Sequence, residues 1–227
     1  MADLLSVIRR HPPLIVAVLL GIGIAVGIGV ALSAMSVLAP PPSPLLRPFG
    51  DNKHWIVSED LVYRIGDTAD YVVVPKGFVT DFASIPQPLW SMGLSPHGQY
   101  SRAAVIHDYL YWAQGCVREQ ADRLMVLAMK ESDVDKFDEV AVYAGVYLGG
   151  RGSWESNRLE RTSGLPRVVP PDYLIPADPN SRWQDYRRFL VAQGVRDPVF
   201  DRTPAYCHHG DTTRVPHSST RAQKQDE

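Results

Sequence analysis

Residues 74–122 read VPKGFVTDFASIPQPLWSMGLSPHGQYSRAAVIHDYLYWAQGCVREQAD, and the rest of the chain is arranged around this stretch. Its ionisable residues lie within apolar sequence. Asp81 is flanked by Val-Thr and Phe-Ala, His107 and Asp108 lie inside a long apolar run, and Asp122 precedes an apolar helix pattern. Burying such groups costs free energy unless they are paired, so a chain that needed only a core would not place them here. The stretch therefore predicts a polar site.

Short strand patterns precede this stretch, at residues 54–57, 61–65 and 71–74, and the last of them resumes at 78–80 after a Pro-Lys-Gly break. Polar clusters that are typical of turns separate the strands. Short strands joined by short turns predict an antiparallel meander rather than βαβ units.

Helical patterns follow the strands. Ser101 is a candidate N-cap for a helix to about Ala113, and a second helix runs from about Arg118 to Lys130. Residues 140–148 are apolar nearly all round, which predicts the central helix of the domain, and the glycines at 149–152 are expected to stop it. The predicted fold class is α+β: a small antiparallel β-meander packed on about three α-helices, preceded by one transmembrane helix.

The N-terminal region carries an uncharged apolar run from Leu14 to Ala39, long enough to span a bilayer. Arg9 and Arg10 precede it, which favours a cytoplasmic N-terminus and a domain outside. We therefore expect a single-pass protein of the inner (cytoplasmic) membrane. A cleaved signal peptide is the alternative, with the small residues 31–34 as a cleavage site, although the run exceeds the usual apolar region of about 7–15 residues.

Small residues recur along this apolar run. A row with a period of four and a GxxxG pair would let two such helices approach closely, so weak self-association is a further expectation. The ordinary abundance of glycine and alanine in spanning helices explains the same pattern. The residues are Ala17, Gly21, Ala25, Gly29 and Ser33 in the row, and Gly23 and Gly27 in the pair.

The predicted organisation has six parts. They are a cytoplasmic segment (1–13), the spanning helix (14–39), a Pro-rich linker (40–50), an α+β domain (51–160), a Pro-rich arm with a short helix at 183–192 (161–206) and a disordered tail (207–227). His208 and His209 open this tail, where we interpret them as solvated side chains rather than metal ligands.

The composition is that of an ordinary globular chain: 45% of residues are hydrophobic and the formal net charge is −2. This balance lacks the basic excess that nucleic-acid binding requires. Cys116 and Cys207 lack metal-type spacing. They permit one disulfide in an oxidising compartment, and two free thiols remain the alternative.

Three motifs in the central stretch carry a family resemblance. VPKGFVTDFASIP, GQYSRAAVIHDYLY and REQAD, in this order, resemble the DUF1353 family, which occurs in bacteria and in tailed phages or prophages. The resemblance covers about residues 55–152. It implies a fold grouping for a domain of unestablished function and supplies no mechanism.

The first functional hypothesis is a metal-dependent hydrolase. Asp81, His107, Asp108 and Asp122 offer the imidazole and carboxylate ligands that suit Zn²⁺ or Mn²⁺. A bound metal would lower the pKa of a water to about 7 and so produce the attacking hydroxide. We expect His107, Asp108 and Asp81 to be catalytic, and an exported enzyme would meet cell-envelope polymers such as peptidoglycan. A metal-free variant uses Ser84 as nucleophile and His107 as base.

The second hypothesis is a non-catalytic binding or scaffold module, related to phage or prophage components, that docks onto an envelope protein. The arm and the helix at Trp183 would then make the contact. In this case the ionisable groups form a structural network, with Arg118 one helical turn before Asp122 and able to pair with it.

Overall fold

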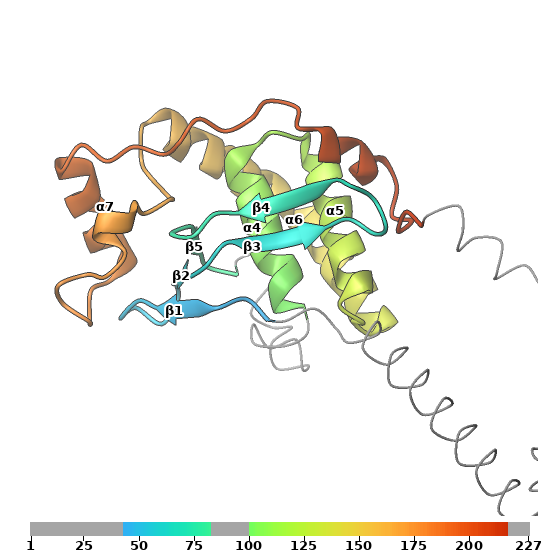
Figure 1. Ribbon diagram of the computed structural model, residues 1–227, viewed down its shortest axis with the longest axis horizontal. Coiled ribbons are helices and arrows are strands. Elements are labelled where there is room, and N and C mark those ends of the chain that lie inside the picture. Colours follow the sequence, from blue (N-terminus) through green and yellow to red (C-terminus); the bar gives the residue numbers. More distant parts are fainter. Residues whose placement is uncertain (1–42, 83–99, 218–227) are drawn as a thin grey trace, which may run out of the picture. The chain divides into compact units, whose positions relative to one another are not determined.

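The computed structural model describes residues 43–82 and 100–217, which belong to one compact unit (Figure 1). The predicted spanning segment, 14–39, lies outside these residues. Across the described ranges, no helix combines the length and apolar character that a membrane span requires. The fold class is α+β with small antiparallel sheets.

The strands form two sheets rather than the single meander that we expected. One sheet has the order β1-β2-β5 and the other is the hairpin of β3 and β4, and all pairs are antiparallel. The strands are β1 (Leu46–Pro48), β2 (Trp55–Val57), β3 (Leu61–Arg64), β4 (Tyr71–Val74) and β5 (Val79–Thr80). Part of the predicted Pro-rich linker is therefore a strand, because β1 pairs with β2.

The turn after β4 explains why β5 joins β2 and not the hairpin of β3 and β4. Gly77 has φ +90°, a conformation that favours glycine, and its N–H donates to the carbonyl of Val57. A Cβ on Gly77 would lie 2.1 Å from the carbonyl oxygen of Val169. This turn directs β5 back to β2, so the chain leaves the hairpin instead of extending it.

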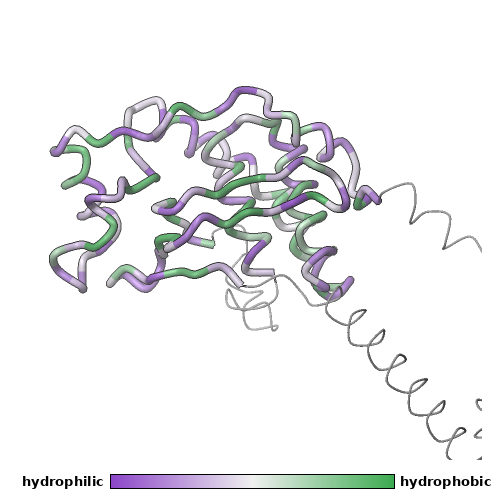
Figure 2. The backbone as a smooth tube through the Cα atoms, viewed as in Figure 1, coloured by the Kyte–Doolittle hydropathy of each residue, from purple (hydrophilic) through white to green (hydrophobic). Residues whose placement is uncertain are grey.

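Three helices follow the strands and pack against one another: α4 (Ser101–Ala113), α5 (Arg118–Glu131) and α6 (Lys136–Thr162). α4 is the central one, because every residue of it except Arg102 and Tyr109 is buried. It contacts α5, α6, β4 and β5. Figure 2 shows hydrophobic residues along the hairpin, whose strand β4 contacts α4. Ser101 is the first helical residue rather than the N-cap, which is Tyr100.

α6 differs most from the prediction. It runs for 27 residues through the glycines at 149–152, and its buried residues are Glu139, Val142, Val146 and Gly150. Within the apolar stretch 140–148 only Val142 and Val146 are buried, whereas Val140, Tyr147 and Leu148 are exposed, so α6 is a surface helix and not the central helix. Gly150 has a packing role, since a Cβ there would lie 2.3 Å from the hydroxyl oxygen of Tyr111.

The predicted arm folds back onto the first sheet. It contains η1 (Pro171–Tyr173) and α7 (Trp183–Ala192), and α7 has the predicted bounds. Trp183 is buried against Phe49, with ring centroids 5.4 Å apart. Besides the main core around α4, the domain has a second hydrophobic cluster, which consists of Phe49, Ile56, Val79, Val169, Trp183, Tyr186, Leu190 and Val195. The arm is thus part of the domain core.

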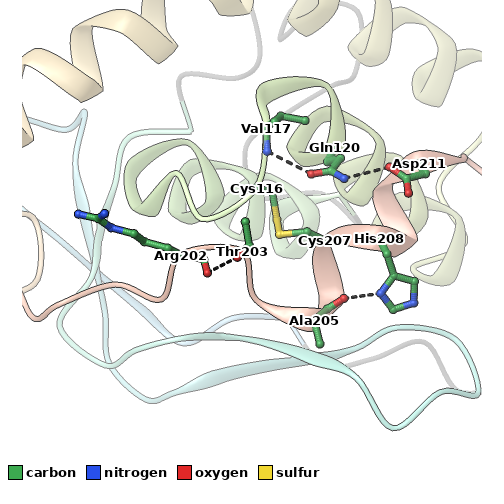
Figure 3. The surroundings of a disulfide bond; sticks show 9 residues. All are labelled: Cys116, Val117, Gln120, Arg202, Thr203, Ala205, Cys207, His208 and Asp211. Carbon is green, nitrogen blue, oxygen red and sulfur yellow. Dashed lines mark hydrogen bonds between the residues drawn. A yellow bond between two sulfur atoms is a disulfide. The ribbon is translucent and has the colours of Figure 1, made fainter.

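The chain then returns to α5 through η2 (Ala205–Asp211), where we expected a disordered tail. A disulfide joins Cys116 to Cys207, with Cα atoms 5.3 Å apart (Figure 3). The side chain of Gln120 donates to Asp211, and Arg123 donates to the carbonyl of Gly210. These contacts explain why the segment is ordered despite its polar sequence.

Candidate functional site

A cavity of about 390 Å³ opens beside α4 and α6. The three residues that we expected to be catalytic, Asp81, His107 and Asp108, all line it, whereas Asp122 does not. The other lining residues are His54, Tyr111, Gly145, Val146, Gly149, Gly150, Ser153, Ser156, Asn157, Glu160, Arg167, Trp183, Gln184 and Arg187.

Asp122 lies behind His107. Its Oδ1 atom is 2.9 Å from Nε2 of His107 and accepts a hydrogen bond of 2.6 Å from the Tyr111 hydroxyl. Its Oδ2 atom accepts from Arg118 Nη1 at 3.0 Å, which confirms the expected pairing one turn apart. The carboxylate therefore fixes the imidazole ring from α5, while Arg118 compensates its charge.

Asp108 connects α4 to the end of β5. Its Oδ2 atom accepts hydrogen bonds from the Thr80 hydroxyl at 2.5 Å and from the backbone N–H groups of Phe82 and Asp81 at 3.0 and 3.3 Å. Burial raises the pKa of Asp108, and the nearby Asp81 carboxylate raises it further, against the opposing charge of Arg167. Asp108 thus keeps its proton to a higher pH than an ordinary aspartate, as a proton donor must.

Asp81 pairs with an arginine from the arm. Nη2 of Arg167 donates to Asp81 Oδ1 at 2.9 Å, and Nε donates to the carbonyl of Val79 at 2.8 Å. Nη1 reaches Asn157 on α6 at 3.1 Å. The carboxylate of Asp197 accepts from the backbone N–H of Arg167 and so anchors it. A single guanidinium therefore joins the sheet, α6 and the arm at the cavity wall.

A second arginine, Arg187 on α7, lies beside it. Its Nη1 donates to Glu160 Oε2 at 2.5 Å, and its guanidinium lies 5.3 Å from the ring centroid of Trp112 and 5.6 Å from that of Trp183. Burial lowers the pKa of Arg187, although the pairing with Glu160 opposes this. Within the described part of the chain, its buried Nη2 atom has no hydrogen-bond partner.

The sequence reading missed the α6 wall and both arginines. Gly145, Gly149, Ser153 and Ser156 recur every three or four residues and line the cavity, a signal that was present in the sequence. No sequence pattern indicated that Arg167 and Arg187 line the cavity, because their positions depend on how the arm folds back onto the domain.

Asp81, His107, Asp108 and Asp122 do not form a group of three ligand atoms within 4.8 Å of one another in the described part of the chain. Among the described residues, the group of three donor atoms within 4.8 Å of one another is Asp70, His208 and His209, and none of these lines the cavity. Both oxygens of Asp122 are already engaged. Metal ligation by Asp81, His107, Asp108 and Asp122 stays a prediction. Ser84 lies outside the described residues.

A family model matches part of the chain. Residues 55–146 match the model of a family described as "Protein of unknown function (DUF1353)", which confirms the resemblance seen in the motifs. No curated protein and no solved structure matches the chain. The matched segment contains Asp81, His107, Asp108 and Asp122 and ends within α6, so Arg167 and Arg187 lie beyond it.

Proposed function

Because residues 55–146 form a DUF1353 domain, whose family description assigns no activity, we propose from the geometry of the cavity that the protein is a hydrolase. The observation that carries the proposal is the contact of 2.9 Å between His107 Nε2 and Asp122 Oδ1, on a wall that His107 shares with Asp108. A histidine held by a buried carboxylate is an arrangement that general acid–base catalysis uses.

Each wall residue then has a chemical role. His107 takes a proton from a water molecule as the water attacks the substrate, and Asp122 stabilises the imidazolium that forms. Asp108, with its raised pKa, gives a proton to the leaving group. Arg167 lies at the same wall and stabilises negative charge that develops on the substrate.

A divalent cation can be added to this scheme. In that form Asp81, His107 and Asp108 would hold the ion, and Asp122 would orient the imidazole from behind, as carboxylates commonly do for metal-bound histidines. The cation would supply an activated water. Because Arg167 already compensates the charge of Asp81, the metal-free form needs no change in the described pairing.

The substrate class rests on location. The predicted N-terminal span with the domain outside, and the disulfide between Cys116 and Cys207, both fit an oxidising compartment beyond the cytoplasmic membrane. We therefore propose a polymer of the cell envelope, with peptidoglycan as the first substrate to test.

A binding module is the second candidate. It is favoured by the pairing of acidic groups with arginines, which also occurs in purely structural networks. The pairs are Asp81 with Arg167, Glu160 with Arg187 and Asp122 with Arg118. Such a module would hold a ligand, or a phage-related or envelope protein, without turnover. Trp183 would not provide the contact, because it is buried in the second hydrophobic cluster.

The deciding experiment incubates the full-length chain with isolated peptidoglycan and measures the release of soluble fragments. We expect His107→Gln to lower the rate by about 100-fold or more, the usual contribution of a general acid or base. His217→Gln is the matched control, because this half-exposed histidine lies away from the cavity. Fragment release that is equal in H107Q and H217Q contradicts the proposal. Binding of peptidoglycan without release supports the module, and loss of release with EDTA supports the metal-dependent form.

A further inference from the structure

A second cluster of ionisable residues lies away from the cavity. Asp70, in the loop before β4, and His208 and His209, in η2, each place one ligand atom within 4.8 Å of the other two. His209 Nε2 is 2.8 Å from Asp70 Oδ2, and the two imidazole centroids are 3.8 Å apart. We propose that these three residues bind a divalent transition-metal ion.

The donor set identifies the class of ion. Two imidazoles and one carboxylate suit Zn²⁺, and also Cu²⁺ or Ni²⁺, whereas Ca²⁺ and Mg²⁺ require oxygen ligands. Three protein ligands leave one position of a tetrahedral zinc ion for water. His208 is exposed and Asp70 is about one-third exposed, so an ion can reach the cluster from solution.

The ring of His208 makes a backbone contact of a kind that is common in metal sites. Its Nδ1 atom contacts the backbone carbonyl of Ala205 (Figure 3). A proton on Nδ1 that is donated to a carbonyl leaves the Nε2 lone pair for a metal, and metal-bound histidines commonly make such a bond with their second nitrogen.

The disulfide holds the cluster in place. Cys207 directly precedes the two histidines, and its bond to Cys116 fixes η2 against α5 (Figure 3). Gln120 and Arg123 on α5 add hydrogen bonds to Asp211 and to the carbonyl of Gly210. The covalent link thus restrains the segment that carries both histidines, and reduction of the disulfide should weaken metal binding.

The test is calorimetric titration of the oxidised full-length chain, prepared without a polyhistidine tag, with ZnCl₂. We expect saturable binding of one ion. His208→Gln, His209→Gln and Asp70→Asn should each weaken the affinity about tenfold or more, given that even residues behind a metal ligand contribute 10–100-fold. His217→Gln and His107→Gln should leave it unchanged. A wild-type chain without saturable binding overturns the proposal, and so does binding that H107Q abolishes and the three ligand variants retain.

A second measurement avoids substitutions altogether. Cu²⁺ added in place of Zn²⁺ to the wild-type chain should give an electron paramagnetic resonance spectrum with coupling to two imidazole nitrogens. Coupling to one imidazole or to none contradicts the assignment. Fragment release from peptidoglycan by H208Q should equal that of the wild type, so this test and that of the hydrolase fail independently.

Discussion

The Nε2 atom of His107 on α4 lies 2.9 Å from Oδ1 of Asp122 on α5, and both side chains are 1% exposed. The contact joins two helices that both lie within the segment matched by the family model. Arg118, one turn before Asp122, closes the network at the edge of the domain. This network should contribute to the stability of the folded domain.

Asp122→Ala should destabilise the domain by about 3 kcal/mol or more, because it removes the buried carboxylate that contacts His107 Nε2 and accepts from the Tyr111 hydroxyl, and it leaves a cavity between α4 and α5. Glu119→Ala is the matched control, since Glu119 pairs with the same arginine but is 49% exposed. It should cost less than about 1 kcal/mol. Urea denaturation measures both changes, and equal losses would show that Arg118 draws no stability from the buried carboxylate.

The raised pKa of Asp108 predicts a pH-dependent difference in stability. The folded state holds this proton above the ordinary value of 3.8, so the contribution of Asp108 is fully present below that value and is lost as pH rises through the folded pKa. The free energy of unfolding of the wild type minus that of Asp108→Asn should therefore fall as pH rises above about 4. Denaturant titrations from pH 4 to 8 measure it, and a difference that grows with pH contradicts the assignment.

Two glycines of α6 form a matched pair. Gly150→Ala places a methyl group where the Tyr111 hydroxyl lies, and it should cost about 1–3 kcal/mol as Tyr111 moves from Asp122. Gly152→Ala meets nothing within 4 Å and should stabilise the helix by about 0.5–1 kcal/mol. Thermal unfolding distinguishes them, and a neutral G150A would mean that the contact adjusts freely.

Removal of the disulfide should destabilise the domain by about 4 kcal/mol, because the linked cysteines are 91 residues apart and the closed loop is long. Comparing Cys116→Ala/Cys207→Ala with the wild type, each with and without a reducing agent, checks this. Reductant should lower the unfolding temperature of the wild type and leave that of the double variant unchanged. If reductant lowered the unfolding temperature of the double variant as much as that of the wild type, the loss of stability would not come from this disulfide.

Local patterns were sufficient for several elements. The bounds of α4 and α7 and the pairing of Arg118 with Asp122 follow from spacing along one helix, which the sequence displays directly. The sequence also predicted that His107 and Asp108 lie together at a polar site, because the two residues are adjacent and the apolar residues around them indicate burial.

Features that depend on distant segments were not predictable in this way. The sequence did not decide whether Cys116 and Cys207 form a disulfide, because the number of cysteines does not show which residues meet in space. The glycines at 149–152 signalled a helix end, but packing of Tyr111 against Gly150 outweighs their low helix propensity. Arg167 and Arg187 enter the cavity only because the arm folds back over β5.

The link between Cys116 and Cys207 also bears on the order in which the protein matures. Synthesis proceeds from the N-terminus, so the partner of Cys116 emerges only after 91 further residues. Arg167 and Arg187 emerge late as well. During synthesis Asp81 therefore precedes its arginine partner by 86 residues. The polar cavity is thus among the last parts of the protein to be completed, and a chain interrupted after residue 146 would carry Asp81 without the arginine that compensates its charge.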